Sequence, residues 1–310
     1  MSEQKTPLVT IGMPVYNGEE YLEEALNSIL AQTFADFELI ISDNASTDRT
    51  EDLCRAYAER DARIQYVRNP VNLGAARNYN HLVDLARGKY FKWASYDDLI
   101  EPDYLERCVA VLEADPDVVL CYTRNMMIDA QGQVTQRYED RFHLVADRPS
   151  VRFRGFFKAP GMCNPIFGLM RLETLRRTDR IGAFRASDRI LLGHMALLGK
   201  IHEVSAPLFY RRMHDKMSMK ANVSDAAIAA WFDPASKRSL LVLFPRWRWV
   251  LEYVRNISRS PMPLGERARC YYHVFRRQVV NRVWWRVEWH TVKHLVSHAI
   301  PRRANHQQPA

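Results

Sequence analysis

Two adjacent carboxylates, Asp97 and Asp98, directly follow an apolar run in the first third of the chain. Neighbouring negative charges disfavour each other unless a cation lies beside them. Mg²⁺ and Mn²⁺ prefer oxygen ligands and can hold diphosphate oxygens as well. This pair therefore indicates a divalent-cation site, and capping of a helix after Leu99 is the structural alternative.

Three further polar clusters come just after apolar runs. They occupy residues 14–17 (Pro-Val-Tyr-Asn), 42–48 (Ser-Asp-Asn-Ala-Ser-Thr-Asp) and 72–78 (Asn-Leu-Gly-Ala-Ala-Arg-Asn). Each cluster, like the Asp97-Asp98 pair, lies between a segment of strand character and a segment that we expect to be a helix or to begin one. The predicted strands and helices therefore decide where these polar clusters lie relative to one another.

Strands and helices alternate along the first 95 residues. The apolar runs at 8–15, 37–42, 64–67 and 90–94 predict strands, and the segments 19–32, 49–60 and 75–86 predict helices. Such alternation predicts βαβ units and a mostly parallel sheet. Ligands of such sheets bind beyond the carboxyl ends of the strands, so the polar clusters should meet at one edge.

This ordered set of motifs resembles the family 2 glycosyltransferases. The resemblance is close from about residue 9 to residue 98 and continues more thinly to about residue 218. It implies an α/β chain with the GT-A fold, in which helices flank a Rossmann-like, mostly parallel central sheet. It also implies an inverting transfer of a sugar from a nucleoside diphosphate donor, with Mn²⁺ or Mg²⁺ as cofactor.

The resemblance assigns roles to matched positions. The implied nucleotide-sugar-binding residues are Pro14, Tyr16, Glu19, Asp43, Asn72, Arg77, Asp97 and Arg212. Asp43 would accept a hydrogen bond from the base, usually uracil, and Asp98 would bind the metal ion. Capping by Asp43, a plain first-turn carboxylate at Glu19 and a solvated Arg77 are the structural alternatives.

Two downstream motifs extend the resemblance. Family members often have Glu-Asp where this chain has Ser187-Asp188, so Asp188 is the candidate general base. Its structural alternative is capping of the following helix. Residues 210–218 resemble an Arg-x-His-x-x-x-Ser signature, in which His214 would complete the metal site or contact the diphosphate and Arg212 would neutralise phosphate charge.

The C-terminal quarter is strongly basic. Residues 236–310 carry 15 Lys and Arg against 3 Asp and Glu, a net charge of +12, and hold five of the seven tryptophans. Basic helices with tryptophan suit anionic membrane surfaces. Packing of these aromatics on the catalytic domain is the alternative, and nucleic acid is not an expected partner because no nucleic-acid-binding module accompanies the segment.

These features predict the organisation of the chain. We expect a transferase domain over residues 1–235, divided into a nucleotide-sugar-binding half (1–98) and an acceptor-side half (99–235). Residues 236–310 should form a basic, Trp-rich helical extension. The composition, 47% hydrophobic and 26% charged, is that of a globular protein. No feature of the sequence predicts the oligomeric state.

The sequence also allows predictions of the cellular location of the protein and of its activity. Five scattered cysteines without a CxxC pair favour a reducing compartment, and no apolar stretch has the length of a signal peptide or a membrane span. We expect a cytoplasmic protein, peripheral at the inner face of the cell membrane, that acts on a saccharide or lipid-linked acceptor in bacterial surface polysaccharide or glycolipid synthesis. A non-catalytic nucleotide-sugar- or membrane-binding module, and a nucleotidyltransferase, are the alternative functions.

Overall fold

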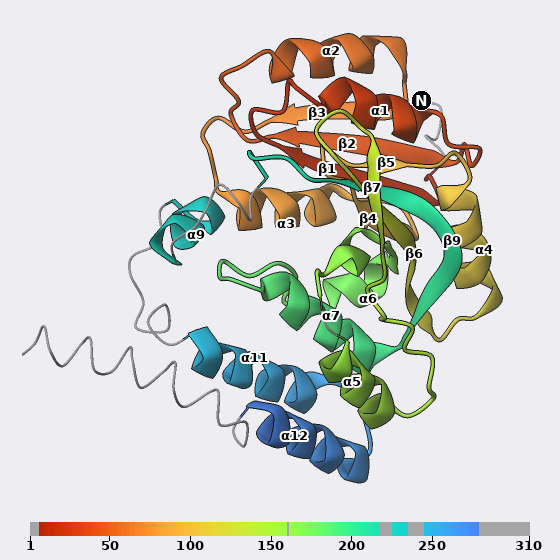
Figure 1. Ribbon diagram of the computed structural model, residues 1–310, viewed down its shortest axis with the longest axis vertical. Coiled ribbons are helices and arrows are strands. Elements are labelled where there is room, and N and C mark those ends of the chain that lie inside the picture. Colours follow the sequence, from red (N-terminus) through yellow and green to blue (C-terminus); the bar gives the residue numbers. More distant parts are fainter. Residues whose placement is uncertain (1–5, 160, 218–224, 235–244, 279–310) are drawn as a thin grey trace, which may run out of the picture.

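A nine-stranded sheet carries the site (Figure 1). The computed structural model describes residues 6–159, 161–217, 225–234 and 245–278. The strands follow the order β3-β2-β1-β4-β8-β6-β9-β5, and β7 pairs with β6 beside this path.

The nucleotide-binding half forms the parallel part of the sheet. Its strands are β1 (Val9–Val15), β2 (Phe37–Asp43), β3 (Ile64–Arg68) and β4 (Tyr90–Trp93), with β1 between β2 and β4. Helices α1 (Leu22–Leu30) and α2 (Thr50–Arg60) lie on one face, and α3 (Ala75–Leu85) lies on the other (Figure 1). Because helices cover both faces, every residue of β1 and β2 is buried.

The second half mixes strand directions. It contains β5 (Leu99–Ile100), β6 (Val118–Ile128), β7 (Val134–Tyr138), β8 (Leu169–Arg171) and β9 (Lys200–Arg212). The long strands β6 and β9 run parallel, while β8 joins β4 to β6 by antiparallel pairing and β5 pairs antiparallel with β9. Helix α4 (Tyr104–Ala114) packs on β6, β8 and β9. The predicted class, a mixed α/β fold around a mostly parallel sheet, is confirmed.

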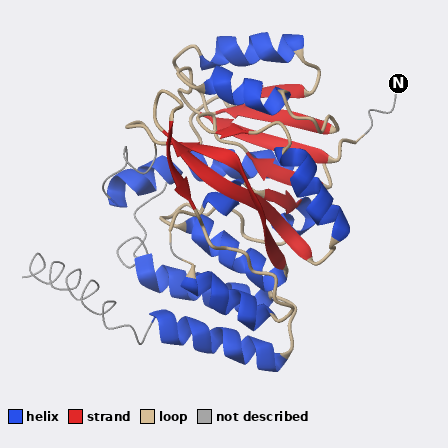
Figure 2. Cartoon of the chain, turned by 45° about the vertical axis from the view of Figure 1, so that its right-hand side comes forward, coloured by secondary structure: helices blue, strands red, loops and turns tan. Residues whose placement is uncertain are grey.

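A group of helices packs beside this second half. They are α5 (Pro149–Lys158), the 3₁₀ helix η1 (Asn164–Phe167), α6 (Leu172–Arg176), α7 (Ser187–Leu198), α11 (Pro245–Arg259) and α12 (Leu264–Gln278). Helix α9 (Asp225–Phe232) instead packs against α3 of the first half. Figures 1 and 2 show α11 and α12 side by side, far from α1 and α2. Both pack on the acceptor-side half, α11 against α7 and α12 against α5.

The basic C-terminal segment is therefore joined to the core as far as the structure describes it. Tyr253 and Ile257 of α11, and Cys270 and Val274 of α12, are buried within the same apolar cluster as the sheet. Residues 282–289, which hold three of the five tryptophans of the basic segment, lie outside the described residues. Among the described residues, no helix combines the length and apolarity needed to cross a bilayer.

Candidate active site

The loops after β1 and β2 are bonded to each other at the carboxyl edge of the sheet. The amide of Asn17 donates to Ser46 Oγ at 2.9 Å, and the amide of Glu19 donates to Asp48 Oδ2 at 3.2 Å. Asp48 Oδ1 also accepts from the amide of Thr50 at 3.0 Å, at the start of α2. These polar residues thus fix the two loops relative to each other.

The predicted nucleoside-side residues of the first loop lie at this edge. Pro14 is within β1 beside Ser42 of β2, and Tyr16 follows the strand with 45% of its surface exposed. Glu19 accepts from the backbone amide of Arg49 at 3.1 Å. The bond between Glu19 and Arg49 joins the first two loops. The roles of Pro14, Tyr16 and Glu19 in binding a nucleoside stay predictions.

Asp43 is fully buried at the end of β2. Its Oδ2 accepts hydrogen bonds from the Tyr66 hydroxyl at 2.8 Å and from Arg68 Nη1 at 2.9 Å. Its Oδ1 accepts from the amide of Ser46 at 2.8 Å. The carboxylate therefore organises the second loop and the end of β3. Its predicted contact with a base is a further role that these bonds do not test.

The third loop joins the same edge through Asn72. Asn72 Oδ1 accepts from Asn44 Nδ2 and from the amide of Gly74, each at 2.8 Å. Arg77, on the first turn of α3, is 60% exposed and its Nη2 lies 3.6 Å from Asp233 Oδ2, just after α9. The structure thus brings the motifs after β1, β2 and β3 to one rim, as the parallel order predicted.

The Asp97-Asp98 pair lies beside the end of β9. His214 Nε2 is 2.8 Å from Asp97 Oδ2, and Asp98 Oδ1 accepts from the amide of Arg212 at 2.9 Å. Burial, and then the neighbouring charge of Asp97, raise the pKa of Asp98 to about 7. The Nδ1 atom of His214 is buried without a hydrogen-bond partner in the described part of the chain.

These residues fit a divalent cation. When Nε2 of His214 donates to Asp97, Nδ1 is left as an acceptor, and metal-binding histidines commonly donate their other N–H to a carboxylate. A cation would also relieve the repulsion between the two carboxylates. No three His, Cys, Asp or Glu side chains converge as a metal cluster among the described residues. Mg²⁺ commonly takes one or two carboxylates and fills its other positions with water and substrate phosphate.

Arg212 is buried beneath this pair. Its side chain is 0% exposed, and its Nη2 lies 2.6 Å from Glu24 Oε2. Its Nε donates to the Asp97 carbonyl at 3.0 Å and its Nη1 to the Ala130 carbonyl at 3.0 Å. These contacts hold the Asp97-Asp98 loop in place. The predicted phosphate contact of Arg212 is not one of them.

Asp188, the candidate base, lines a cavity of about 370 Å³ bounded by residues of α3, η1, β9 and α9. Its Oδ1 accepts from the amide of Arg189 at 2.7 Å. Burial raises the pKa of Asp188. A raised pKa brings a carboxylate closer to the range in which it can take a proton at neutral pH. Tyr79, Phe167 and Trp231 form part of the apolar wall.

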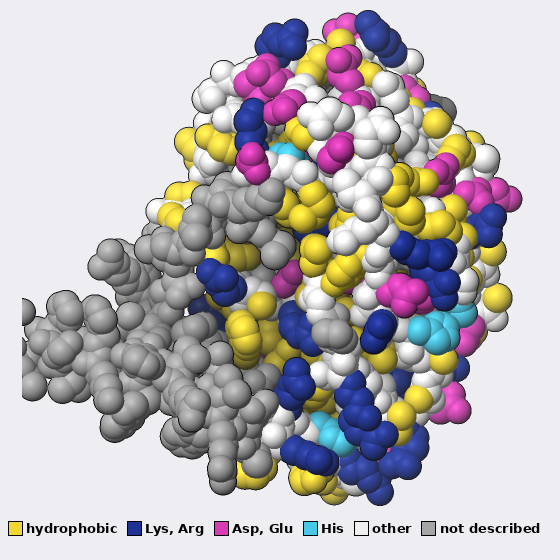
Figure 3. Space-filling view, in the orientation of Figure 1, with side chains coloured by type: hydrophobic (Ala, Val, Ile, Leu, Met, Phe, Trp, Pro, Cys, Tyr) yellow, Lys and Arg dark blue, Asp and Glu magenta, His cyan; other side chains and the backbone are white. Residues whose placement is uncertain are grey.

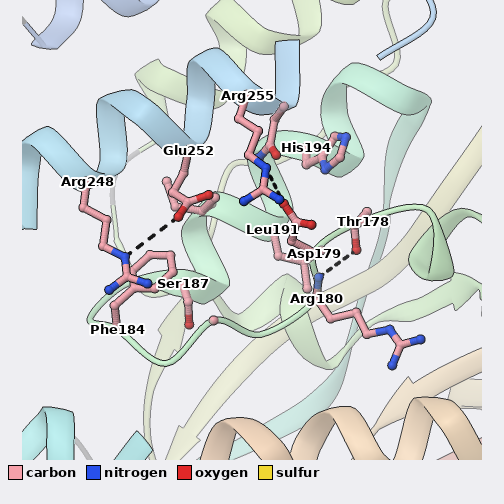
Figure 4. A pocket seen from close by; sticks show the side chains of 13 residues that line it. Thr178, Asp179, Arg180, Phe184, Ser187, Leu191, His194, Arg248, Glu252 and Arg255 are labelled. Atoms are coloured by element: carbon pink, nitrogen blue, oxygen red, sulfur yellow. Dashed lines mark hydrogen bonds and ion pairs between the residues drawn. The ribbon is translucent and has the colours of Figure 1, made fainter. Parts of the chain in front are cut away.

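The loop before Asp188 is held by α11 (Figure 4). Trp249 Nε1 donates to the Arg185 carbonyl at 3.0 Å, and the Arg248 guanidinium lies 4.1 Å from the centre of the Phe184 ring. Figure 4 shows Phe184 and Ser187 below α11, around a small cavity of about 140 Å³. Helix α11 of the basic segment thus contacts the loop that leads into Asp188, and no local sequence pattern indicates these contacts.

Two polar residues of the site were not predicted. Arg211 lines the Asp188 cavity and its Nη1 donates to Asn164 Oδ1. Asp140 is 1% exposed and accepts from the amide of Asn164 at 3.3 Å and from its Nδ2 at 3.1 Å. Burial raises the pKa of Asp140 to about 7. Alternation along β9 places Arg211 and Arg212 on opposite faces, but it does not say which face the cavity occupies.

Comparison with known proteins now identifies the family. Residues 10–175 match the family model described as glycosyl transferase family 2. The chain belongs to this family. An uncharacterized glycosyltransferase of Methanocaldococcus jannaschii is 33% identical over 141 residues, 45% of this chain and 49% of the relative. EpsH of Bacillus subtilis is 31% identical over 227 residues, 68% of this chain and 62% of that protein. The matched part thus spans less than two thirds of either relative.

Solved structures are similar over nearly the whole chain. TarS of S. aureus, residues 1–349 in complex with UDP-GlcNAc, has a TM-score of 0.64 at 16% identity and covers 93% of this chain and 80% of its own. The mannosyltransferase PcManGT from Pyrobaculum calidifontis, in complex with GDP-Man and Mn²⁺, has a TM-score of 0.53 at 18% identity, over 95% and 76%. At these identities the likeness shows the fold, which is GT-A as predicted.

Proposed function

We propose that this family 2 protein is an inverting glycosyltransferase that moves a sugar from a nucleoside diphosphate donor, a UDP-sugar, to an acceptor hydroxyl. One observation carries the proposal. Asp98 is bonded to the backbone of Arg212, and the neighbouring Arg211 lines the same cavity as Asp188. A donor-side and an acceptor-side carboxylate are thereby linked through consecutive residues of β9.

The donor would bind along the rim of the parallel strands. The proposed contacts are those of Pro14, Tyr16, Glu19, Asp43, Asn72, Arg77 and Asp97. The similarity to structures described with UDP-GlcNAc and GDP-Man supports a nucleotide sugar. Uracil is the proposed base because Asp43 matches the family position that accepts from it. Asp98 and His214 would hold Mn²⁺ or Mg²⁺, which when bound supplies Lewis-acid stabilisation of the departing diphosphate.

Asp188 would act on the acceptor. Its carboxylate takes the proton of the acceptor hydroxyl as the oxygen attacks the anomeric carbon. Attack from the side opposite the leaving group inverts the anomeric configuration. The apolar walls of the cavity would keep bulk water from the anomeric carbon, and water would otherwise compete with the acceptor.

The basic helices α11 and α12 support attachment to an anionic membrane surface. Trp247, Leu251 and Val254 are exposed at helical spacing on α11, and Tyr272 and Phe275 are exposed on α12. The same two helices carry five exposed arginines, Arg255, Arg259, Arg269, Arg276 and Arg277, of which Arg255 and Arg259 pair with Asp179. Lys and Arg side chains gather over the lower part of the molecule in Figure 3. Apolar stripes flanked by arginines suit the boundary between lipid phosphates and acyl chains.

This arrangement favours a lipid-linked or surface-polysaccharide acceptor, with residues 1–235 as the transferase domain and the segment from residue 236 as its membrane-facing extension. Vesicle co-sedimentation tests the attachment. We expect binding to vesicles containing phosphatidylserine or phosphatidylglycerol and loss of that binding in Arg276→Glu/Arg277→Glu. Equal binding to neutral phosphatidylcholine vesicles would contradict an electrostatic contact.

A donor screen tests the activity. UDP-, GDP- and dTDP-sugars are added to the full chain with and without Mn²⁺, and the unfolding temperature is measured. A bound donor stabilises the folded state in proportion to the logarithm of its excess over Kd. We expect Mn²⁺-dependent stabilisation by a UDP-sugar, together with slow donor hydrolysis. Stabilisation without any hydrolysis or transfer would favour a non-catalytic nucleotide-sugar-binding module.

A further inference from the structure

Successive arginines on β9 have opposite surroundings. Arg212 is 0% exposed and gives hydrogen bonds to Glu24 and to the carbonyls of Asp97 and Ala130. Arg211 is half-buried and lines the cavity of about 370 Å³. In the described part of the chain, its guanidinium makes a single hydrogen bond, to Asn164 Oδ1. A guanidinium carries five N–H donors, so most of the donors of Arg211 remain for a ligand.

The position of Arg211 links the two carboxylates of the proposed reaction. The amide of the next residue, Arg212, holds Asp98 Oδ1 at 2.9 Å, and the side chain of Arg211 shares the cavity with Asp188. Arg211 therefore joins the end of β9 that holds Asp98 to the cavity that contains Asp188.

A network of buried hydrogen bonds holds the side chain of Arg211 at the cavity wall. Asn164, which accepts from Arg211, donates its amide and its Nδ2 to Asp140, and Asn125 Nδ2 donates to the same carboxylate. The guanidinium also lies 5.8 Å from the centre of the Phe167 ring. Because the guanidinium of Arg211 is already held in place, it loses little conformational entropy when it binds an anion.

The other arginines near the cavity are used differently. Arg189 Nη2 donates to the Ala159 carbonyl at 2.9 Å, and its guanidinium lies 4.9 Å from the centre of the Phe156 ring. Arg77 is paired with Asp233 at 3.6 Å. Arg185 is exposed at the cavity wall. Among these described arginines, Arg211 thus combines partial burial, unused donors and a place next to the residue whose amide binds Asp98.

We infer that Arg211, rather than Arg212, contacts the sugar-linked phosphate of the donor's diphosphate, which becomes the terminal phosphate of UDP. The departing diphosphate must lie between the carboxylate that would hold the cation and the anomeric carbon that the acceptor attacks near Asp188. Guanidinium groups bind phosphate oxygens through two parallel hydrogen bonds. The inference rests on the proposed function and identifies a binding residue outside the Arg-x-His motif.

Binding of UDP and UMP to the full chain tests this assignment. Isothermal titration is performed with Mn²⁺ on the wild type, Arg211→Gln, Arg211→Lys and the matched control Arg107→Gln, which changes a 52% exposed arginine of α4 that does not line the cavity. Hydrogen bonds to charged groups predict that Arg211→Gln weakens UDP binding by about 10- to 100-fold. Arg211→Lys should lie between Arg211→Gln and the wild type, and Arg107→Gln should bind as the wild type does.

The comparison of UDP with UMP separates a phosphate contact from general damage. We expect UMP affinity to change little in Arg211→Gln, because UMP lacks the terminal phosphate. An equal loss for UMP and UDP, or unchanged UDP binding in both Arg211 variants, would overturn the inference alone. A wild type that binds no nucleoside diphosphate would overturn the proposed function and the inference with it. If Arg211→Gln does not fold, as judged by its thermal unfolding, Arg211→Lys decides the question.

Discussion

The rim formed by the loops after β1, β2 and β3 and the acceptor-side cavity around Asp188 are held by contacts of different range. At the rim, Asn17 binds Ser46 and Asn44 binds Asn72, pairs that are 29 and 28 positions apart. Around Asp188, the supporting contact from Trp249 to the carbonyl of Arg185 spans 64 positions. Glu266 of α12 reaches the amide of Ser150 in α5 across 116 positions. The rim is thus built from consecutive βα units, and the base is positioned by distant helices.

This difference predicts that the two regions can be damaged separately. Changes at the rim should alter donor binding without altering the acceptor step. Changes in α11 or α12 should alter the position of Asp188, or the stability of its surroundings, without altering nucleotide affinity.

Asp188→Asn should have the largest effect. Removal of a general base lowers turnover by about 10²- to 10⁴-fold, and donor affinity should stay at the wild-type value. Steady-state transfer assays measure the first and UDP titration the second. Burial raises the pKa of Asp188. In the pH profile of wild-type turnover, the loss of activity toward acid should therefore occur at a higher pH than the usual pKa of an aspartate. Asp84→Asn, a 60% exposed carboxylate on α3, is the matched control. Unchanged turnover would remove Asp188 from the mechanism.

Glu266→Gln should destabilise the acceptor side. Hydrogen bonds from Ser150, together with Arg148, lower the pKa of Glu266 to about 2. A carboxyl with a lowered folded pKa contributes stability above its unfolded pKa of about 4.3, and that stability is lost as the pH falls through the folded value. We expect a loss of about 1–3 kcal/mol at pH 7 in urea unfolding. The difference from the wild type should shrink between pH 4 and pH 2, and a pH-independent difference would be inconsistent with this ion pair.

Asn72→Ala should weaken the donor side. The variant loses hydrogen bonds to Asn44 and to the amide of Gly74, each worth about 0.5–1.5 kcal/mol. We expect the donor KM to rise by about 3- to 10-fold with kcat nearly unchanged. Asn27→Ala, which removes a contact of Tyr57 on the surface of α1, serves as the control. A fall in kcat at constant KM would contradict the separation of the two regions.

Trp249→Phe should have the smallest effect. Phenylalanine keeps most of the ring and removes the N–H that binds the Arg185 carbonyl. The loop before Asp188 then loses one hydrogen bond, which predicts a decrease in kcat of about 2- to 10-fold at unchanged UDP affinity. A change in nucleotide affinity instead would show that α11 acts on the donor side.

The same difference in range explains what could be predicted from the sequence. Alternating strands and helices over residues 9–94 predicted the parallel half and its rim, because each motif directly follows the strand that positions it. The resemblance to family 2 implied that His214 completes the metal site of Asp98 or contacts the diphosphate, and the structure places His214 beside Asp97. Local patterns were enough for the parallel half, and the resemblance added His214.

The acceptor side could not be predicted in the same way. Nothing local to Asp188 indicates that α11 supports its loop, since that contact depends on how the chain returns to the core. Arg211 and Arg212 are identical in type and adjacent in sequence, so only the faces of β9 distinguish them. Arg212 was predicted from its motif, whereas the structure buries it and exposes Arg211 to the cavity.

Mn²⁺-dependent UDP binding in Asp98→Asn and Asp188→Asn tests the central claim most directly, namely that the two carboxylates serve different steps. Isothermal titration is performed with Mn²⁺ and with EDTA on both variants and the wild type. We predict that Asp98→Asn loses the increase in UDP affinity that Mn²⁺ gives the wild type, and that Asp188→Asn keeps it in full while transfer is lost. Equal loss of the Mn²⁺ effect in both variants, or its retention in Asp98→Asn, would contradict the account.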